Sequence, residues 1–268
     1  MHMVKRILVG SRVGSLCAIL AAAPLAAQNP LAPGGTLRAA FLGDNPSLGR
    51  VDRATGTVTG PVADMVKELA RRMGVAYTLI PVPNARVVAE SVLNQSADIG
   101  FMAYNAGRAK EVDFSAPWLL MPNTYLVRAD SPIQKVDDAD RAGVRIIAVK
   151  NDTQDVYLSA HLKNTSVTPV PKVPETEEVK SLLLGGKTDA LAANRQRLVE
   201  IAGDDNRLRI VADDFFVAGQ AIAITKGESS RIDTLNKLIE EILKTDSVKT
   251  SIEHAGLRGV YPAKPKGR

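Results

Sequence analysis

The sequence predicts an α/β protein made of two lobes, and two features of the chain carry that prediction. From residue 36 onward, apolar strand-like runs alternate with amphipathic helical patterns, which is typical of α/β folds. The alternation breaks at a connector over residues 131–143 and then begins again, so two β/α units follow one another. With 268 residues, of which 45% are hydrophobic, the chain is long enough to bury the core of such a fold.

Residues 1–27 are predicted to be a signal peptide. Basic residues at the start are followed by the apolar stretch VGSLCAILAAAPLA, which ends in small residues. This stretch is shorter than the ~20 residues that a membrane-spanning helix needs. We therefore expect cleavage near Ala27, a mature protein in the periplasm, and a spacer over residues 28–35.

Loss of this segment limits the function classes that the composition allows. It contains three basic residues and no acidic ones, so the formal charge falls from +5 to about +2 and a nucleic-acid partner is not expected. The single cysteine, Cys17, also lies in it, which leaves no thiol for catalysis, disulfides or metal binding. Motifs for a nucleophile elbow, a phosphate loop or a zinc protease are missing, so we expect no enzyme, no metal and no cofactor.

The first β/α unit opens with a strand, a helix and a second strand. The helix is expected to end at Gly74, since glycine often follows the last helical turn. A further helix, a buried strand and a strand that leaves the unit follow. In chain order these elements are TLRAAFL (36–42), PVADMVKELARRMG (61–74), AYTLIPV (76–82), ARVVAESVLNQ (85–95), ADIGFMA (97–103) and TYLVRA (124–129).

The second unit and the end of the chain repeat the same kinds of element. The unit alternates strands and helices, and the last third has one strand followed by two helices with a break near residues 245–247. In chain order the predicted elements are VRIIAVK (144–150), TQDVYLSAHL (153–162), SVTPVPKV (166–173), TEEVKSLLLGG (176–186), DALAA (189–193), QAIAITKG (220–227) and the two helices within residues 230–256. Residues 259–268 are predicted to be a basic flexible tail.

Arg108 is the candidate binding residue of the first unit. It follows the strand end IGFMA and the short turn YNAG, the kind of position where an open α/β sheet forms its ligand crevice. An arginine there can present its planar fork to a carboxylate through two parallel hydrogen bonds. A surface ion pair with Glu111 or Asp113 is the alternative, and the frequency of arginine alone favours it.

Asp152 and Thr153 mark the start of a helix in the second unit. They follow an apolar strand and precede QDVYL, which is an N-cap signature. The amides of such a helix start can bind an anion. This stretch alone supports a simple helix cap equally well.

Taken together, several segments resemble the family 3 periplasmic solute-binding proteins, the amino-acid-type substrate-binding subunits of ABC importers. The resemblance spans residues 36–258. Its most specific part is RAKEVDFSAPW (108–118), which is similar to the family pattern T-x-x-R-x-x-x-x-D-F-S-x-P-Y. The other segments are GTVTGPVADMVKELARRMGV, ADIGFMAYNAG, YLVRADSPI and AIAITKG followed by two helices.

The resemblance implies the two-lobed periplasmic binding protein fold of type II, in which each lobe is a β-sheet flanked by helices and two hinge strands connect them. Lobe 1 is expected to be discontinuous, with residues 36–126 and 220–258. Lobe 2 is expected over residues 127–219. The hinges are expected near residues 125–131 and 215–221.

The resemblance also implies the ligand contacts. Arg108 would bind the ligand carboxylate with help from the neighbouring strand end, and the start of the second-unit helix would form the opposite wall. The expected contacts beside Arg108 are Met102, Tyr104, Asn105, Thr153, Gln154, Asn194 and Asp44.

The chain departs from the family pattern at several positions. Amino-acid binders of this family carry acidic residues for the ligand ammonium, and the corresponding positions here are Leu42 and Asn194. The family threonine before the arginine is Asn105, which can still donate and accept hydrogen bonds. Because an ammonium is costly to bury without an anion, we hypothesise a ligand with a carboxylate and no free α-ammonium unless Asp44 supplies the charge. Asp44 also fits an ordinary turn residue.

The function implied by the resemblance is capture of a small carboxylate-bearing solute, an amino acid or a related organic acid, by closure of the lobes. The expected partner is an inner-membrane ABC permease, and we expect a monomer with no membrane span in the mature chain. One alternative is an exported enzyme similar to cyclohexadienyl dehydratase, for which the sequence offers no convincing general acid. Another is a sensory protein that presents its ligand to a receptor.

Overall fold

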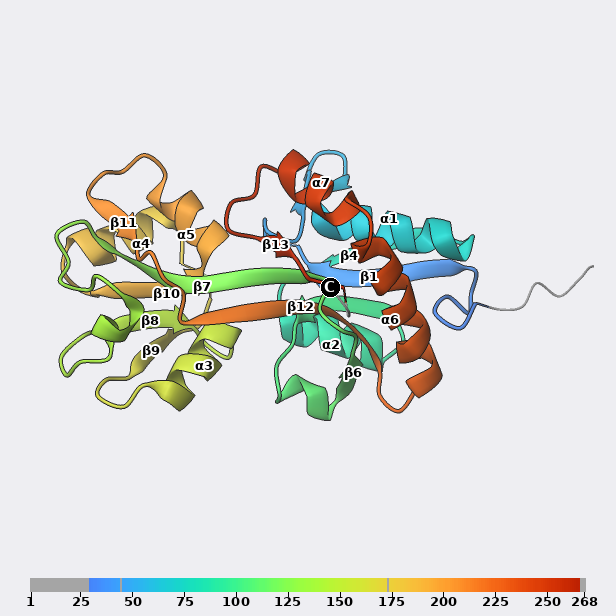
Figure 1. Ribbon diagram of the computed structural model, residues 1–268, viewed down its shortest axis with the longest axis horizontal. Coiled ribbons are helices and arrows are strands. Elements are labelled where there is room, and N and C mark those ends of the chain that lie inside the picture. The colour runs from blue at the N-terminus through green and yellow to red at the C-terminus, as the bar shows by residue number, and fades with distance from the viewer. Residues whose placement is uncertain (1–28, 44, 173, 266–268) are drawn as a thin grey trace, which may run out of the picture.

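The computed structural model describes residues 29–43, 45–172 and 174–265. Two α/β bodies lie side by side, and the long strands β7 (Leu119–Arg128) and β12 (Phe216–Thr225) run through both (Figure 1). The predicted α/β fold with two lobes is therefore confirmed. The predicted signal peptide lies outside the described residues.

One sheet connects the two lobes through these crossing strands. Its main path is β4 (Ala76–Val82), β1 (Thr36–Leu42), β5 (Ile99–Ala103), β12, β7, β10 (Ala190–Asn194), β8 (Ile146–Val149) and β9 (Val167–Val170). Three short strands pair beside this path: β6 (Val112–Phe114) with β12, and β11 (Leu208–Ile210) and β13 (Tyr261–Pro262) with β7. A separate hairpin is formed by β2 (Arg50–Val51) and β3 (Val58–Thr59).

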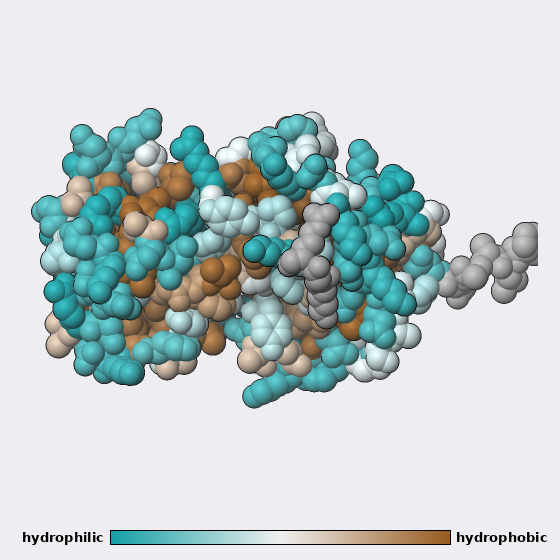
Figure 2. Space-filling view, viewed as in Figure 1, coloured by the Kyte–Doolittle hydropathy of each residue, from teal (hydrophilic) through white to brown (hydrophobic). Residues whose placement is uncertain are grey.

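Helices cover both faces of the sheet in each lobe, and each face has its own apolar core. Lobe 1, with β1 to β6 and β13, carries α1 (Pro61–Met73), α2 (Ala85–Leu93), α6 (Ser229–Leu243) and α7 (Ser247–His254). Lobe 2, with β8 to β11, carries α3 (Thr153–His161), α4 (Thr176–Leu184) and α5 (Arg195–Ala202). Hydrophilic side chains cover most of the visible surface, and hydrophobic ones show mainly around the crossing strands (Figure 2). None of the described helices is long and apolar enough to cross a membrane.

The β1–α1–β4 unit forms as its sequence predicts. Pro61 stands at the start of α1, where its missing N–H costs nothing. Gly74 adopts a left-handed conformation with φ 67° and ends the helix. The apolar side chains between them recur at helical spacing and are buried under the helix: Val62, Met65, Val66, Leu69 and Ala70.

The crossing strands exchange partners in the middle of the molecule. Residues 119–123 of β7 pair antiparallel with residues 216–220 of β12. Asn123 is also the first β7 residue to pair with β10 of lobe 2, and Gln220 is the first β12 residue to pair with β5 of lobe 1. These two polar residues therefore lie where the crossing strands enter the lobes.

Both ends of the described chain pack against lobe 1. Leu31 and Ala32, in the predicted spacer, are buried in its core. The sequence predicts a flexible tail over residues 259–268, whereas Tyr261 and Pro262 pair with β7 as β13. We correct that prediction for these two residues, because the neighbouring Val260 and Ala263 bury their side chains and hold the strand in place.

Candidate ligand-binding site

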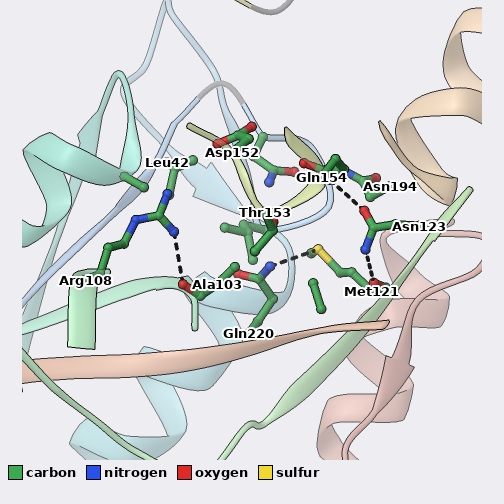
Figure 3. A pocket seen from close by; sticks show the side chains of 14 residues that line it. Leu42, Ala103, Arg108, Met121, Asn123, Asp152, Thr153, Gln154, Asn194 and Gln220 are labelled. Carbon is green, nitrogen blue, oxygen red and sulfur yellow. Dashed lines mark hydrogen bonds between the residues drawn. The ribbon is translucent and has the colours of Figure 1, made fainter. Parts of the chain in front are cut away.

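A small cavity lies between the lobes, and the predicted residue Arg108 lines it (Figure 3). Its volume is about 50 Å³, enough for a few waters because one water needs about 10–15 Å³. Its polar lining is Asn45, Arg108, Asn123, Asp152, Thr153, Gln154, Asn194 and Gln220; Leu42, Leu48, Ala85, Ala103, Met121 and Ala218 form the rest. A larger solute can enter only if the lobes or these side chains move apart.

Arg108 is held at the cavity by the turn that follows β5. The side-chain Oδ1 of Asn105 accepts hydrogen bonds from the backbone N–H groups of Gly107, at 2.7 Å, and Arg108, at 3.3 Å. A short 3₁₀ helix over Arg108–Lys110 then begins. Asn105 therefore stabilises the turn that places Arg108 at the cavity. Asn105 itself does not line the cavity.

The guanidinium of Arg108 reaches across the cleft. Its Nη1 donates to the carbonyl oxygen of Ala103 at 3.2 Å, and its Nη2 donates to that of Asn151 at 3.4 Å. Ala103 belongs to lobe 1 and Asn151 precedes α3 in lobe 2, so one side chain bridges the lobes. Among the described residues Arg108 forms no ion pair, and the surface salt bridge with Glu111 or Asp113 that the sequence allowed is not present.

Burial changes the charge balance around Arg108. It lowers the pKa of the guanidinium, and the negative charge of Asp152 acts in the opposite direction. Burial raises the pKa of Asp152 in turn, while Arg108 lowers it and Asp155 raises it further. Desolvation disfavours the charged form of each side chain. The opposite charge of the other side chain partly compensates for this cost.

The start of α3 forms the lobe 2 wall of the cavity, and Thr153 and Gln154 line it. Asp152 stands at the N-cap, yet its side chain makes no capping hydrogen bond within the described part of the chain. Asp155 accepts a hydrogen bond from the backbone N–H of Asn151 at 2.8 Å. Two carboxylates therefore already lie at this helix end, where their negative charge offsets the attraction of the helix dipole for an anion.

Side-chain amides form the part of the lining away from Arg108. Gln154 Nε2 donates to Asn123 Oδ1 at 2.6 Å, and Asn123 Nδ2 donates to the carbonyl of Met121 at 2.8 Å (Figure 3). Asn194 Oδ1 accepts from the backbone N–H of Arg197 at 2.9 Å and caps α5. The fully buried Asn123 thus joins lobe 2 to the crossing strand β7.

Two other predicted contacts lie away from the cavity. Met102 is 1% exposed and packs in the lobe 1 core beneath α2. Tyr104 is 52% exposed and its ring meets the edge of Phe114. We therefore leave Met102, Tyr104 and Asn105 out of the proposed ligand contacts. Asp44 lies outside the described residues.

Four polar lining residues were not predicted as ligand contacts: Asn45, Asn123, Asp152 and Gln220. Asn123 and Gln220 each interrupt an apolar strand, LLMPNTYLV and QAIAI, and a polar residue in a buried strand is a signal that could have been used. Asp152 was recognised only as a helix cap. Its exposure to the cavity depends on the way that lobe 2 meets Arg108, which a local pattern does not contain.

A family model described as "Bacterial extracellular solute-binding proteins, family 3" matches residues 37–254 of this chain. Two curated relatives are named as glutamine-binding proteins. The ABC transporter glutamine-binding protein of Bacillus subtilis (strain 168) is 25% identical over 56% of this chain and 53% of its own length. The glutamine-binding protein of Geobacillus stearothermophilus is 28% identical over 60% of this chain and 62% of its own length. Both matches thus cover less than two thirds of the relatives.

Solved structures with the same fold cover most of both chains. A putative binding component of an ABC transporter from Wolinella succinogenes, complexed with lysine, has a TM-score of 0.70 at 20% identity, over 82% of this chain and 95% of that one. Holo ArgBP from T. maritima has a TM-score of 0.62 at 23% identity, over 82% and 95%. An ancestral amino acid-binding protein, a precursor of cyclohexadienyl dehydratase, has a TM-score of 0.67 at 21% identity, over 82% and 94%. At these identities the likeness shows the fold.

Proposed function

Because the chain belongs to the bacterial extracellular solute-binding proteins of family 3, we propose that it is the substrate-binding component of an ABC importer and captures a small carboxylate-bearing solute between its lobes. The curated relatives are solute-binding proteins rather than enzymes. Both relatives are named as glutamine-binding proteins, so glutamine is the first solute to test. The family is described as extracellular, and the proposal includes export, cleavage near Ala27 and a monomer in the periplasm.

The position of Arg108 is the observation that carries this proposal. Its guanidinium lies at the cavity and donates only to neutral carbonyl oxygens, one from each lobe. A ligand carboxylate that replaced these acceptors would form charge-assisted hydrogen bonds, which are about twice as strong as neutral ones. Arg108 can therefore gain interaction energy from a carboxylate without losing an existing ion pair.

Closure of the lobes follows from the same geometry. The walls contributed by Arg108 and by Thr153 and Gln154 belong to different lobes, so a ligand makes its full set of contacts only when both walls are close. This differential affinity shifts the population toward the closed form. We propose that the closed form is what an inner-membrane permease recognises.

Thermal unfolding in the presence of candidate solutes tests the proposal. A solute that binds the folded state raises the melting temperature by mass action. The protein, purified after export and freed of ligand by unfolding and refolding, is assayed with amino acids and with the matching carboxylates that lack the amino group. At least one of these compounds is expected to raise the melting temperature.

The variant Arg108→Ala assigns the effect to this side chain. We expect it to abolish the stabilisation by ligand with little change in the melting temperature of the free protein, since the arginine makes only two long hydrogen bonds to carbonyls. Arg53→Ala, at an exposed position in the β2–β3 turn, is the control and should retain the full effect. Retained ligand stabilisation in Arg108→Ala would contradict the carboxylate role.

A further inference from the structure

A segment of lobe 1 contacts lobe 2 outside the cavity. It is the connector between α7 and β13, residues 256–260, and it extends toward α5 of lobe 2 (Figure 1). The backbone N–H of Arg258 donates to Oε1 of Gln196 at 2.5 Å. Gln196 lies in the first turn of α5 and is only 4% exposed. The lobes therefore meet through two residues that do not line the cavity.

The α7–β13 connector is fixed to lobe 1. Leu257 and Val260 pack against the apolar core of that lobe. The following strand β13 pairs with Leu119 and Leu120, at the lobe 1 end of β7. Because its apolar side chains and its strand are held in this way, the connector cannot follow α5 when the lobes separate. Its contact with Gln196 is then lost.

Gly259 of the connector fits closely against the side chain of Arg195 in α5. A Cβ added at residue 259 would lie 2.6 Å from Cδ, 2.8 Å from Cγ and 3.1 Å from Cβ of Arg195. The guanidinium of Arg195 is fixed within lobe 2 by Asp214 and by the carbonyl oxygens of Val211 and Ala212. Its aliphatic part cannot swing aside without breaking these bonds. A methyl group at residue 259 would therefore push α5 away from the connector.

The same side of α5 makes a second contact with lobe 1. Gln196 Nε2 donates to Glu200 Oε1 at 3.1 Å, and Glu200 pairs with Arg50 of the β2–β3 hairpin at 3.2 Å. Two separate segments of lobe 1 thus meet one turn of α5. Asn194, which caps this helix, lines the cavity. Contacts that hold α5 against lobe 1 therefore also hold one wall of the cavity in place.

We propose that the α7–β13 connector and the first turn of α5 form a latch that stabilises the closed form, so that Gln196 and Gly259 raise the affinity for the solute without touching it. The effect on affinity rests on the proposed function. Contacts that exist only when the lobes are close favour the closed form. A solute that needs the closed form then binds more tightly, because more of the protein is competent to bind it. Gln196 and Gly259 are positioning residues.

Binding of L-glutamine to the protein purified after export and refolded without ligand tests the latch. Gly259→Ala should bind L-glutamine about tenfold more weakly than the wild type, a loss of about 1.4 kcal/mol, because the added methyl group clashes only when the lobes are close. Stopped-flow measurements should assign the loss to faster dissociation, as is usual for variants of one binding site.

Gly256→Ala is the matched control. Gly256 lies in the same connector with a φ of 64°, against 69° for Gly259, and nothing lies within 4 Å of its added Cβ. Alanine is strained by a positive φ at either position, and this strain is equal in the open and closed forms. Gly256→Ala should therefore lower the melting temperature of the free protein and keep the wild-type affinity.

Gln196→Met removes the other half of the latch. It keeps a side chain of similar length and deletes the acceptor of the Arg258 N–H. Dissociation of L-glutamine should again become faster. Equal affinities and equal dissociation rates in Gly259→Ala and Gly256→Ala would overturn the role of Gly259, and a wild-type dissociation rate in Gln196→Met would overturn that of Gln196.

A disulfide tests the contact without any solute. The only cysteine of the sequence, Cys17, lies in the predicted signal peptide. The Cβ atoms of residues 195 and 259 would be 3.1 Å apart, close to the separation of about 3.5–4.5 Å in disulfides. Mild oxidation of the ligand-free protein with copper phenanthroline should therefore cross-link the double variant Arg195→Cys/Gly259→Cys. The control pair Arg195→Cys/Gly256→Cys should stay reduced, because no atom of Arg195 lies within 4 Å of that Cβ.

The outcomes distinguish this inference from the proposed function. If the two cysteine pairs cross-link to the same extent, or neither does, the latch falls, while loss of binding in Arg108→Ala would still support the proposed function. If only the pair at residues 195 and 259 cross-links and no amino acid or matching carboxylate binds, the contact between the lobes stands. The proposed function then falls, together with the effect of the latch on affinity.

Discussion

Asp152 affects the stability of the ligand-free protein. Burial works against the negative charge of its carboxylate. The protein without ligand therefore carries a desolvation cost for this charge.

The same feature gives a pH dependence with a definite sign. Burial raises the pKa of Asp152, Arg108 lowers it and Asp155 raises it further, and the net shift is upward. The contribution of Asp152 to stability is therefore fully present below the unfolded pKa of about 3.9. That contribution is lost as the pH rises through the raised value in the folded state. Asp152→Asn should therefore have a higher free energy of unfolding than the wild type at pH 7.

Urea titrations between pH 4 and pH 7 measure this difference. The gain in Asp152→Asn should shrink as the pH falls toward the unfolded pKa, because the wild-type carboxyl then becomes neutral as well. A lower stability of Asp152→Asn at pH 7 would mean that attraction to Arg108 outweighs the cost of burial, and Asp152 would then be a structural partner of the arginine.

The sequence indicated part of this site for clear physical reasons. Arg108 and Thr153 stand next to strand ends and helix starts, and these positions can be recognised from local patterns alone. The lining contributed by Asn123 and Gln220 depends on where two strands from distant parts of the chain pair with each other. Asp152 could be recognised as a helix start, but its place opposite Arg108 depends on the closeness of the lobes.

At the scale of elements, the packing of α2 on β5 determines where Arg108 stands. Gly100 of β5 lies directly beneath this helix, and an added Cβ would be 2.7 Å from Val88 Cγ1 and 2.9 Å from Val92 Cγ2. These distances are shorter than side chains tolerate, so the two valine side chains or α2 itself must shift to admit a methyl group. The strand end that leads to the Arg108 turn would shift as well.

Gly100→Ala should lower the free energy of unfolding by about 1–3 kcal/mol, the usual cost of overpacking a core. Urea denaturation measures the change. Gly34→Ala is the control, because nothing lies within 4 Å of its added Cβ, and its stability should match the wild type. An unchanged midpoint for Gly100→Ala would show that α2 adapts without cost.

The sequence predicts β1 and β4 with their observed limits and α1 to within one residue. The sequence reading missed α5, RQRLVEIA, because it is short and mostly polar, with Leu198 and Ile201 as its buried apolar residues. It also started β7 at residue 124 instead of Leu119. Pairing with β12 and β10 extends the strand back through Pro122 and Asn123.

At the scale of the whole molecule, two chain crossings connect the lobes, and contacts at the mouth of the cleft hold them together. Arg50 of lobe 1 pairs with Glu200 of lobe 2 at 3.2 Å, in an exposed position. Exposed ion pairs contribute roughly 0–1 kcal/mol. This ion pair therefore adds little to the stability of the closed arrangement, and we propose that ligand contacts decide how much of the closed form is populated.

Fluorescence energy transfer between dyes on the two lobes measures this closure. The only cysteine, Cys17, lies in the predicted signal peptide, so Ala54→Cys and Asp204→Cys, at exposed positions of lobe 1 and lobe 2, give two specific labelling sites in the exported protein. Addition of a bound solute should increase the transfer efficiency. The increase should be absent when Arg108→Ala is added, and constant efficiency during a binding event would contradict closure.

The strand order also bears on the order of folding events when the chain is made from its N-terminus. In the sheet β5 lies between β1 and β12. The chain reaches the end of β12, at Thr225, more than 120 residues after the end of β5. Until then the growing first lobe exposes an unpaired edge of buried strand, a template for aggregation. The strands and helices of lobe 2 follow one another along the chain from β8 to β11, so lobe 2 can fold before β12 is made. Lobe 1, which holds Arg108, is then the last to be completed.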